Sequence, residues 1–494
     1  MRTDQAVSEA TRGFLARAHG LLIDGTWVGP GARRLSSVDP ADGQELTQIA
    51  CASRQEVEDA VAAARRSFEE RRWLRLASTE RARILWRIAE LIERESQLLA
   101  ELETLDAGKL LSDTRNGDVP FAAEVFRYQA GWCTKLEGRQ IDVGPDSAAF
   151  RCLMVREPVG VAALIVPWNG ALTIGSWKIA PALAAGCSIV VKPSEHATLS
   201  LLKLGELILE AGVPPGVVNI VTGPGSSVGA ALVAHPQVDK ISFTGSSRTG
   251  RQIVIAAAER FKKLTLELGG KSPVIVCADA DLESAAAGIA SGIFGGAGEV
   301  CVAGSRLYIE RSVYPQLLER LALEALKLKL GPGMDPESRM GPLISAAHRE
   351  HVAGLVRAGI AEGARTVAGG RLREGAGFFY EPTILADCEP QMTPVREEIF
   401  GPVLCAMPWD SLDEVVAAAN DSQFGLAGSI WTQDLNRATQ LTSRIRAGLL
   451  WVNAHGVPDP AVPFGGYKAS GWGREQGREG IEAFTELKSV MVRR

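Results

Sequence analysis

The sequence predicts an α/β protein whose core is a parallel sheet with helices on both faces. From residue 159 onward, short apolar segments alternate with segments of helical character, and the strand candidates are 161–166, 188–191, 217–221, 240–243 and 264–267. Short, continuously apolar strands are typical of strands buried on both faces, and their alternation with helices is typical of parallel sheets. Glycine is frequent, at 52 of 494 residues, against a usual share of about 7%. This excess favours tight turns and close approaches of the backbone to a ligand.

Two helices are predicted before this series. Residues 53–70 open with Ser53 and Glu56, which form a capping box, and continue with apolar residues at helical spacing. Residues 79–104 show one long amphipathic pattern, which Gly108 is expected to end. Both segments therefore supply helices that can cover the sheet.

Further elements are predicted on either side of the first series. Residues 136–157 carry apolar residues on both sides of a turn and predict a β-hairpin, and residues 486–492 predict a strand. Residues 278–455 show a second strand–helix series, with elements at 303–310, 312–330 and 404–419, and predict a second α/β domain. The hairpin and the last strand stand outside both domains, so they are natural contacts between subunits.

The composition excludes several classes of protein. The 53 basic and 58 acidic residues give a net charge of −5, without the basic patches on which nucleic-acid affinity rests. The eight cysteines form no C-x-x-C pair and no clustered Cys/His spacing, so no metal site is expected and the thiols are expected to be reduced. Residues 1–5 lead into a polar stretch unlike a signal peptide, and the apolar runs are too short or interrupted to span a bilayer. We therefore expect a soluble, cytoplasmic protein whose partners include neither nucleic acid nor a membrane.

Polar residues and glycines follow the predicted strands at their carboxyl ends. Ligands of open α/β sheets bind beyond these ends. The sequence therefore predicts a dinucleotide site formed by Asn169, Lys192, Glu195, Gly223, Gly245 and Glu267. The spacing Gly223-x-Gly225-x-x-x-Gly229 misses the dinucleotide fingerprint by one residue and adds little by itself.

One cysteine stands between small residues at a predicted turn. Cys301 lies in the stretch Gly298-Glu299-Val300-Cys301-Val302-Ala303-Gly304. Taken alone, it is either a buried structural thiol or a nucleophile. Glu267, at a strand end, is likewise either a structural acid or a catalytic one.

Together these motifs resemble the NAD(P)-dependent aldehyde dehydrogenase superfamily along nearly the whole chain. The stretches that carry the resemblance, in family order and spacing, are Pro167-Trp168-Asn169, Lys192-Pro193-Ser194-Glu195, Phe243-Thr244-Gly245-Ser246, Leu266 to Pro273, Cys301 to Arg306, Glu398 to Pro402 and Pro463 to Lys468. Three further stretches are similar to the phenylacetaldehyde dehydrogenase branch: His19 to Trp27, Gly341 to Ser345, and Asp459-Pro460.

The resemblance implies the aldehyde dehydrogenase fold and its division into domains. A Rossmann-like NAD-binding domain is expected from residues 1–135 and 158–266, and a catalytic domain from residues 267–459. The small β element made of residues 136–157 and 478–494 is expected to join subunits into a homodimer or a homotetramer.

The resemblance also implies a mechanism for oxidising a small-molecule aldehyde to the acid. Cys301 is the implied nucleophile, because hydride can leave from the hemithioacetal that a thiolate forms. Asn169 and the Cys301 backbone N–H are the implied oxyanion donors, and Glu267 activates the water that hydrolyses the thioester. Lys178 and Glu475 match a supporting proton relay, for which a solvated surface pair is the alternative. A turn residue is the alternative for Asn169, and a structural ion pair for Glu267.

The implied cofactor is NAD, with NADP as the alternative. Lys192 and Glu195 are expected near the adenine ribose, and Glu195 would repel a 2′-phosphate, while Lys192 softens this preference. Gly245 and Ser246 are expected at a helix start, beside the pyrophosphate. The cofactor-binding residues implied by the resemblance are Val166, Pro167, Trp168, Lys192, Ser194, Glu195, Gly225, Gly229, Phe243, Thr244, Gly245, Ser246, Leu268, Gly269, Glu398 and Phe400.

Departures from the family pattern lie near the nucleophile. Most relatives have Gln at the position of Glu299, whose carboxylate would raise the Cys301 pKa if it pointed inward; we expect it to point away. Glycines at 170, 295 and 296 replace residues that are aromatic or polar in many relatives, and the stretch before Pro463 reads His455-Gly456-Val457-Pro458. With Trp177 and Phe464 as the remaining aromatic walls, we expect a wide pocket for bulky aromatic or branched aldehydes. The expected substrate-binding residues are Gly170, Trp177, Gly295, Val300, Val302, His455 and Phe464.

Two rival functions are weighed against hydrolytic aldehyde oxidation. A CoA-acylating or phosphorylating relative is opposed by Glu267, because those branches commonly lack this base. A catalytically silent binding or structural relative is opposed by the joint presence of Cys301, Asn169 and Glu267, and is favoured only by the altered loop at 295–299.

Overall fold

Five short apolar strands form the centre of the first sheet, as the sequence predicts. The computed structural model describes residues 7–29, 31, 33–143 and 149–493. Its first sheet has eight strands in the order β19 (Gly471–Trp472), β11 (Lys263–Glu267), β10 (Lys240–Thr244), β7 (Val161–Ile165), β8 (Ser188–Lys192), β9 (Val218–Ile220), β1 (Leu21–Ile23) and β2 (Thr26–Val28). The five central strands, β11 to β9, are parallel, which confirms the predicted arrangement. The antiparallel edges β19, β1 and β2 were not predicted.

Helices cover both faces of this sheet because its strands are apolar on both sides. Along β7, Val161, Ala163 and Ile165 pack into one core, and Ala162 and Leu164 pack into the other. Three helices contribute to the first core: α2 (Arg54–Glu69), α9 (Ala230–Ala234, after the π-helical turn Gly225–Gly229) and α10 (Ser247–Ala258). The second core is formed mainly by α3 (Ser78–Arg94), α4 (Ser96–Ala107), α6 (Val119–Trp132), α7 (Ala171–Ala185) and α8 (Leu199–Glu210), and α1 (Glu9–Leu15) and α17 (Gly477–Glu482) each add one buried residue, Phe14 and Ile481. The predicted Ser53–Glu56 capping box starts α2 and is confirmed.

The prediction of a single helix at 79–104 is wrong, because the structure has two helices that meet at Glu95. At Glu95 the backbone has φ −95° and ψ 18°, outside the helical region. The break lets α4 sink into the core, where every residue from Leu98 to Ala107 is buried, whereas α3 keeps a polar face. Gly108 ends α4 with a positive φ of 75°, as predicted.

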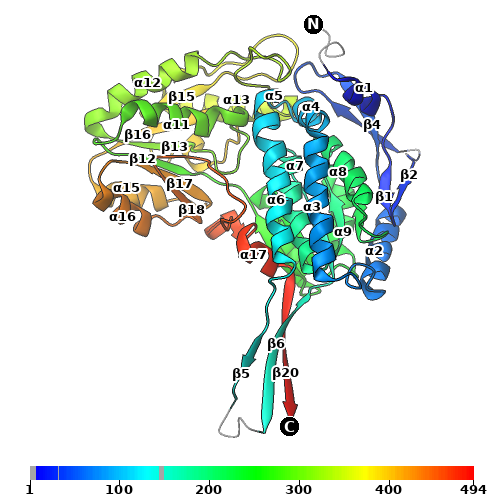
Figure 1. Ribbon diagram of the computed structural model, residues 1–494. Helices are drawn as coiled ribbons and strands as arrows, with labels where there is room; N and C mark the ends of the chain where they lie inside the picture. The colour runs from blue at the N-terminus through cyan, green and yellow to red at the C-terminus, as the bar shows by residue number, and fades with distance from the viewer. Residues whose placement is uncertain (1–6, 30, 32, 144–148, 494) are drawn as a thin grey trace.

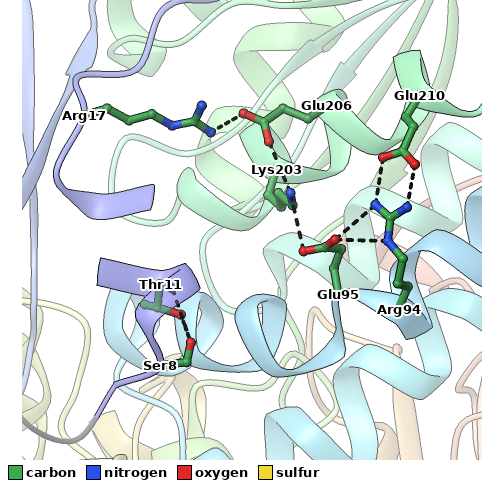
Figure 2. A network of polar contacts seen from close by, with 8 residues as sticks. All are labelled: Ser8, Thr11, Arg17, Arg94, Glu95, Lys203, Glu206 and Glu210. Carbon is green, nitrogen blue, oxygen red and sulfur yellow. Dashed lines mark hydrogen bonds and ion pairs between the residues drawn. The ribbon is translucent and has the colours of Figure 1, made fainter. Parts of the chain in front are cut away.

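Charged side chains link this break to the neighbouring helix α8. Figure 2 shows Arg94 between Glu95 and Glu210, and Lys203 between Glu95 and Glu206. Because Arg94 and Glu210 are exposed to water, which screens their charges, ion pairs of this kind contribute little to stability. These ion pairs link the junction of α3 and α4 to α8 at the surface of the protein.

We call each large sheet, together with the helices that cover it, a lobe. The N-terminal region completes the first lobe. This region contains α1 (Glu9–Leu15) and the two-stranded sheet of β3 (Arg34–Val38) and β4 (Glu45–Ala50). Three short helices from elsewhere in the chain belong to the same lobe: α5 (Leu111–Asp113), the π-helical segment η2 (Thr114–Asp118) and α17 (Gly477–Glu482). Ser8 caps α1, and the Ser8 and Thr11 hydroxyls both donate to the Glu101 carboxylate on α4. Residues 1–6, including those on which the expectation about a signal peptide rests, lie outside the described part of the chain.

The second lobe is the predicted second α/β unit. Its seven strands run in the order β14 (Arg365–Ala368), β15 (Thr383–Ala386), β16 (Val403–Trp409), β13 (Arg306–Glu310), β12 (Pro273–Val276), β17 (Ala427–Trp431) and β18 (Leu449–Val452). Its helices are α11 (Leu282–Phe294), α12 (Tyr314–Leu326), α13 (Ala346–Ala361), α14 (Thr393–Arg396), α15 (Leu412–Asn420) and α16 (Leu435–Arg444), with short 3-10 turns at Gly295–Gly298, Arg311–Val313 and Lys468–Ser470. All neighbouring strands are parallel except β14 and β15.

A three-stranded arm projects from the two lobes (Figure 1). It consists of β5 (Arg139–Ile141), β6 (Phe150–Pro158) and β20 (Thr485–Arg493), in the order β20-β6-β5. The predicted hairpin and C-terminal strand are thus both present, and they pair with each other along the whole length of β6. The hairpin turn at 144–148 lies outside the described residues. Within the described ranges, no helix is long and apolar enough to cross a membrane.

Candidate active site

Cys301 lies on a loop that is held tightly against the link between the two sheets. The loop follows α11 and turns through left-handed conformations at Gly296, Ala297 and Gly298, which have φ values of 55°, 54° and 71°. A Cβ added to Gly270, on the link between β11 and β12, would lie 2.3 Å from the Cys301 carbonyl oxygen. Only glycine fits there, so the carboxyl end of β11 and the cysteine loop are brought together.

The Cys301 thiol is in an environment that disfavours its charged form. Burial raises the pKa of Cys301 to about 12, with further contributions from the nearby carboxylates of Glu267 and Glu398. The side chain still keeps partial exposure, whereas the other seven cysteines are buried. In this structure the thiol is therefore protonated and reachable.

Glu267 ends β11 as a buried carboxyl group without a protein partner. Neither of its oxygens has a hydrogen bond, and 2% of the residue is exposed. Burial, followed by the negative charge of Glu475, raises the pKa of Glu267 well above its usual range, and Lys178 partly opposes this. A buried acid that lacks partners is ready to take a hydrogen bond from a ligand or a water molecule.

Lys178 and Glu475 form a buried pair beside Glu267. The Lys178 ammonium on α7 donates to the Glu475 carboxylate and, at 2.9 Å, to the Ser242 hydroxyl on β10. The Ser242 hydroxyl donates to the same Glu475 oxygen at 2.7 Å. The alternative of a solvated surface pair is therefore wrong, because helix packing removes both charges from water. Ser242 belongs to this network and carries no motif that would mark it in the sequence.

Asn169 follows β7 and fastens the cysteine loop from the other side. Its side-chain amide donates to the Glu299 carbonyl oxygen at 2.8 Å. An amide group has two N–H donors, so a second one remains for a ligand. Asn169 and Cys301 both line the same cavity, which brings the two expected oxyanion donors to one place.

The Glu299 carboxyl group is turned away from Cys301. Its Oε1 accepts a hydrogen bond from the Ile344 backbone N–H at 2.9 Å and lies 3.6 Å from His348 Nε2. Burial raises the pKa of Glu299 well above its usual range, and the charges that raise the Cys301 pKa are those of Glu267 and Glu398. This geometry agrees with the expectation that Glu299 points away.

The residues expected near the adenine ribose converge at the carboxyl end of β8. Lys192 Nζ lies 3.6 Å from Glu195 Oε2, and the Gly225 backbone N–H donates to Glu195 Oε1 at 3.3 Å. A Cβ added to Gly229 would be 3.5 Å from the Lys192 side chain. Ser194 accepts a hydrogen bond from the His196 N–H and shapes the turn between them.

A helix start lies beside this corner. Ser246 caps α10 by accepting from the Thr249 N–H at 3.3 Å, so the first backbone N–H groups of the helix point outward without intrahelical partners. The Phe243 ring lies under Gly245, where a Cβ would come within 2.5 Å of it. The Thr244 hydroxyl is buried without a partner.

The remaining cofactor candidates surround the start of the link between the lobes. Glu398 Oε1 accepts from the Gly270 N–H at 2.7 Å, and burial raises the Glu398 pKa to about 7. A Cβ added to Gly269 would meet the Glu398 carboxyl at 2.1 Å. The Phe400 ring contacts the edge of Trp168 at 5.5 Å between centroids. For three more candidates, the structure shows backbone features. The Leu268 N–H donates to the Ser470 carbonyl, and the Val166 N–H donates to the Lys192 carbonyl. Pro167 separates Val166 from Trp168.

An apolar cavity of about 300 Å³ opens onto Cys301. Of the predicted residues, it is lined by Asn169, Gly170, Trp177, Val300, Val302 and Phe464. The Trp177 and Phe464 rings stack at 5.3 Å between centroids. The expectation that these two are the remaining aromatic walls is wrong, because Phe121 from α6 and Trp451 from β18 also line the cavity. Neither stands in a motif, and both lie far from Cys301 in the sequence.

Two predicted pocket residues lie elsewhere. The His455 ring is turned behind the wall, where its nitrogens lie 2.9 Å from the Ser429 hydroxyl and 2.9 Å from the Val302 carbonyl oxygen. It supports Val302 rather than lining the cavity. Gly295 lines a second, smaller cavity, which shares Asn169 and Val300 with the first. No cluster of three or more His, Cys, Asp or Glu side chains suited to a metal ion is present among the described residues.

Known proteins resemble the chain over almost its full length. The sequence matches the profile described as Aldehyde dehydrogenase family over residues 27–490. It is 44% identical over 480 residues to the phenylacetaldehyde dehydrogenase of Pseudomonas fluorescens, covering 96% of each chain. It is 45% identical over 476 residues to the betaine aldehyde dehydrogenase of Bacillus subtilis, covering 95% of this chain and 96% of that one.

Solved structures agree with these sequence matches. The fold superposes with a TM-score of 0.97 on an aldehyde dehydrogenase from Bacillus cereus in complex with NAD+, which is 41% identical, with 99% of each chain covered. The chain therefore belongs to the aldehyde dehydrogenase family and is an enzyme that oxidises aldehydes with NAD.

Proposed function

We propose that this enzyme oxidises a bulky, aromatic aldehyde of the phenylacetaldehyde type to its carboxylic acid, without CoA, through a covalent adduct on Cys301. The observation that carries the proposal is the cavity of about 300 Å³ that ends at Cys301 and is walled by Phe121, Trp177, Trp451 and Phe464. A cavity of about 150 Å³ already holds a benzene ring. The relative from Pseudomonas fluorescens is named for phenylacetaldehyde.

Cys301 acts as the nucleophile. The Cys301 thiol, which is partly exposed, gives its proton to water, and the thiolate adds to the aldehyde carbon. The adduct oxygen takes hydrogen bonds from the free N–H of the Asn169 amide and from the Cys301 backbone N–H. The hydrogen bond from Asn169 to the Glu299 carbonyl fixes this amide against the cysteine loop. NAD, when bound, supplies the acceptor for the hydride that leaves the adduct carbon.

Glu267 acts as the base in the second half of the reaction. It takes a proton from the water that attacks the thioester, and the acid then leaves Cys301 as the thiol re-forms. The unpartnered carboxyl oxygens of Glu267 and its raised pKa suit this role. The buried pair adjusts the proton affinity of Glu267: the Glu475 charge raises it and the Lys178 charge lowers it. Ser242 holds the two charges together through its hydrogen bonds.

The residues at the strand ends fit NAD. Lys192 and Glu195 hold the adenine ribose, and the Glu195 carboxylate disfavours a 2′-phosphate. Gly245 and Ser246 present the open start of α10 to the pyrophosphate, and glycines at 225 and 229 leave room beside it. Glu398 and Phe400 hold the nicotinamide end, and the close fit of Gly269 against Glu398 fixes that carboxyl group.

We also propose that the chain has the three domains predicted from the sequence, and that the third, the arm, joins subunits. Residues 136–157 and 478–494 carry exposed apolar side chains at Ile141, Phe150, Val490, Met491 and Val492. Such a patch favours contact with a second copy. Sedimentation of the native enzyme as a dimer or tetramer, and of Val490→Lys/Val492→Lys as a smaller species, is expected; a native monomer would refute it.

The proposed function is tested by NADH formation from NAD and phenylacetaldehyde without CoA. The wild type and Cys133→Ala, a buried cysteine far from the cavity, are expected to be active, and Cys301→Ala is expected to be inactive. Activity that required CoA, or that survived in Cys301→Ala, would refute the proposal.

A further inference from the structure

We propose that the substrate site is forked, and that a second chamber beside Cys301 receives a compact polar branch on the carbon next to the aldehyde. This inference rests on the proposed function, since it assigns a substrate feature to the same site. It concerns the smaller cavity, of about 190 Å³, which is lined by residues 295–297, 299 and 300 of the cysteine loop.

The chamber adjoins the main cavity at the reacting group. It lies between segments 107–110 of the first lobe and 339–342 and 295–297 of the second. Asn169 and Val300 line both spaces, and Val300 directly precedes Cys301. A substituent on the carbon next to the carbonyl group therefore meets the chamber, while the rest of the substrate extends into the aromatic cavity.

Two glycines keep the chamber open. A Cβ built on Gly295 has no atom within 4 Å, so any side chain at this position would occupy free space in the chamber. The next residue, Gly296, has a φ of 55°, which other residues rarely adopt. On the opposite wall, a Cβ added to Gly108 would lie 2.9 Å from Pro342, so that wall is closely packed.

The two spaces differ in chemistry. Four aromatic rings wall the main cavity, whereas Asp113, Glu299 and Arg339 line the chamber alone. Lys109 and Asp118, which are 2.6 Å apart, form an ion pair at the junction and line both spaces. Both side chains are mostly shielded from water, with exposures of 16% and 21%. An ammonium group has three N–H donors, of which Asp118 takes one. Positively and negatively charged side chains lie together here, and they offer both hydrogen-bond donors and acceptors. A neutral hydroxyl or amide branch therefore fits the chamber better than a second aromatic ring or a branch with a net charge.

Three aldehydes test this fork: phenylacetaldehyde without a branch, 2-phenylpropanal with a methyl branch, and 3-hydroxy-2-phenylpropanal with a hydroxymethyl branch. For the wild type, we expect kcat/KM for the hydroxymethyl compound to be within about tenfold of that for phenylacetaldehyde and at least threefold above that for the methyl compound. Gly295→Leu is expected to lower kcat/KM for both branched aldehydes at least tenfold, and that for phenylacetaldehyde less than threefold.

Gly117→Leu is the matched control. Gly117 also has no atom within 4 Å of an added Cβ, but it lines the main cavity. A leucine side chain at position 117 would fill part of the main cavity, so we expect Gly117→Leu to lower kcat/KM for all three aldehydes by similar factors. Thermal unfolding and NAD binding of both variants check that the fold is retained.

A binding measurement separates this inference from the proposed function. Calorimetry on Cys301→Ala is expected to show that adding Gly295→Leu weakens the binding of 3-hydroxy-2-phenylpropanoic acid at least tenfold and leaves that of phenylacetic acid within threefold. Equal losses for branched and unbranched ligands in both assays, or a wild type that rejects branched aldehydes a hundredfold, would overturn the fork while leaving the proposed function intact. Failure to oxidise phenylacetaldehyde would instead refute the proposed function, and the binding result would still decide the fork.

Discussion

The Lys178 ammonium donates a hydrogen bond to the Glu475 carboxylate in the interior, where Lys178 has no exposed surface and Glu475 has 2%. The pair joins α7 to the segment after β19, and Ser242 on β10 closes it into a triangle. The Glu475 backbone also pairs with Phe464, a wall of the aromatic cavity, through two hydrogen bonds of 2.7 Å. The charges that act on Glu267 are therefore attached to a wall of this cavity.

Replacing one member of this pair is expected to destabilise the fold strongly. Lys178→Met leaves the Glu475 carboxylate buried without its cation, which costs about 3–5 kcal/mol. The double variant Lys178→Met/Glu475→Leu is expected to recover most of this loss, because no uncompensated charge remains. Urea unfolding of the three proteins measures the difference; a cost below about 1 kcal/mol for Lys178→Met would contradict the buried pair.

Glu267→Gln is expected to block the second half of the reaction and spare the first. The amide cannot take a proton from water, so turnover should fall by about 10²–10⁴. A first, stoichiometric burst of NADH should persist, because Cys301 still forms the thioester. Rapid mixing with NAD and phenylacetaldehyde shows both phases. If the burst were lost along with turnover, Glu267 would be acting before hydrolysis.

Alkylation of Cys301 without NAD is expected to depend steeply on pH. Its pKa is raised to about 12, so the thiolate fraction, and with it the rate, should rise about tenfold per pH unit from pH 7 to 10. The other seven cysteines are buried, which makes iodoacetamide labelling, followed by mass spectrometry, a single-site measurement. Glu398→Gln should speed labelling, since the Glu398 charge raises the Cys301 pKa, and Glu299→Gln should leave it unchanged. A plateau below pH 9 would contradict this environment.

Glu299→Gln is expected to stabilise the protein more as the pH rises. The folded-state pKa of Glu299 lies well above its unfolded value, so wild-type stability is lost as the pH rises above the unfolded value of about 4.3. The amide has no such loss and can still accept the Ile344 N–H. The stability gap between variant and wild type should therefore widen between pH 5 and pH 7. The exposed control Glu374→Gln should show no widening; a constant gap for Glu299→Gln would place its carboxylate in a solvated site.

Much of the framework was predictable because its signals are local. The capping box of Ser53 and Glu56 marks the start of α2, and Gly108 marks the end of α4. The apolar strands followed by glycines and polar residues predict a parallel sheet with a ligand site at one edge, since parallel strands end together. The break at Glu95 was not predictable, because the periodicity of 79–104 is continuous and only packing of α4 on all sides requires a bend.

The sequence by itself determined the family, and it indicated Cys301, Glu267 and the strand-end residues that we propose to hold NAD, because each stands in a motif whose spacing is fixed along the chain. Only the tertiary structure decided which side chains meet across the chain: Phe121 and Trp451 in the cavity wall, His455 behind it, and Lys178 with Glu475 inside the core. It also decided that Glu299 turns toward Ile344. The direction and solvation of a side chain depend on elements that are distant in sequence, and no local pattern records how those elements pack.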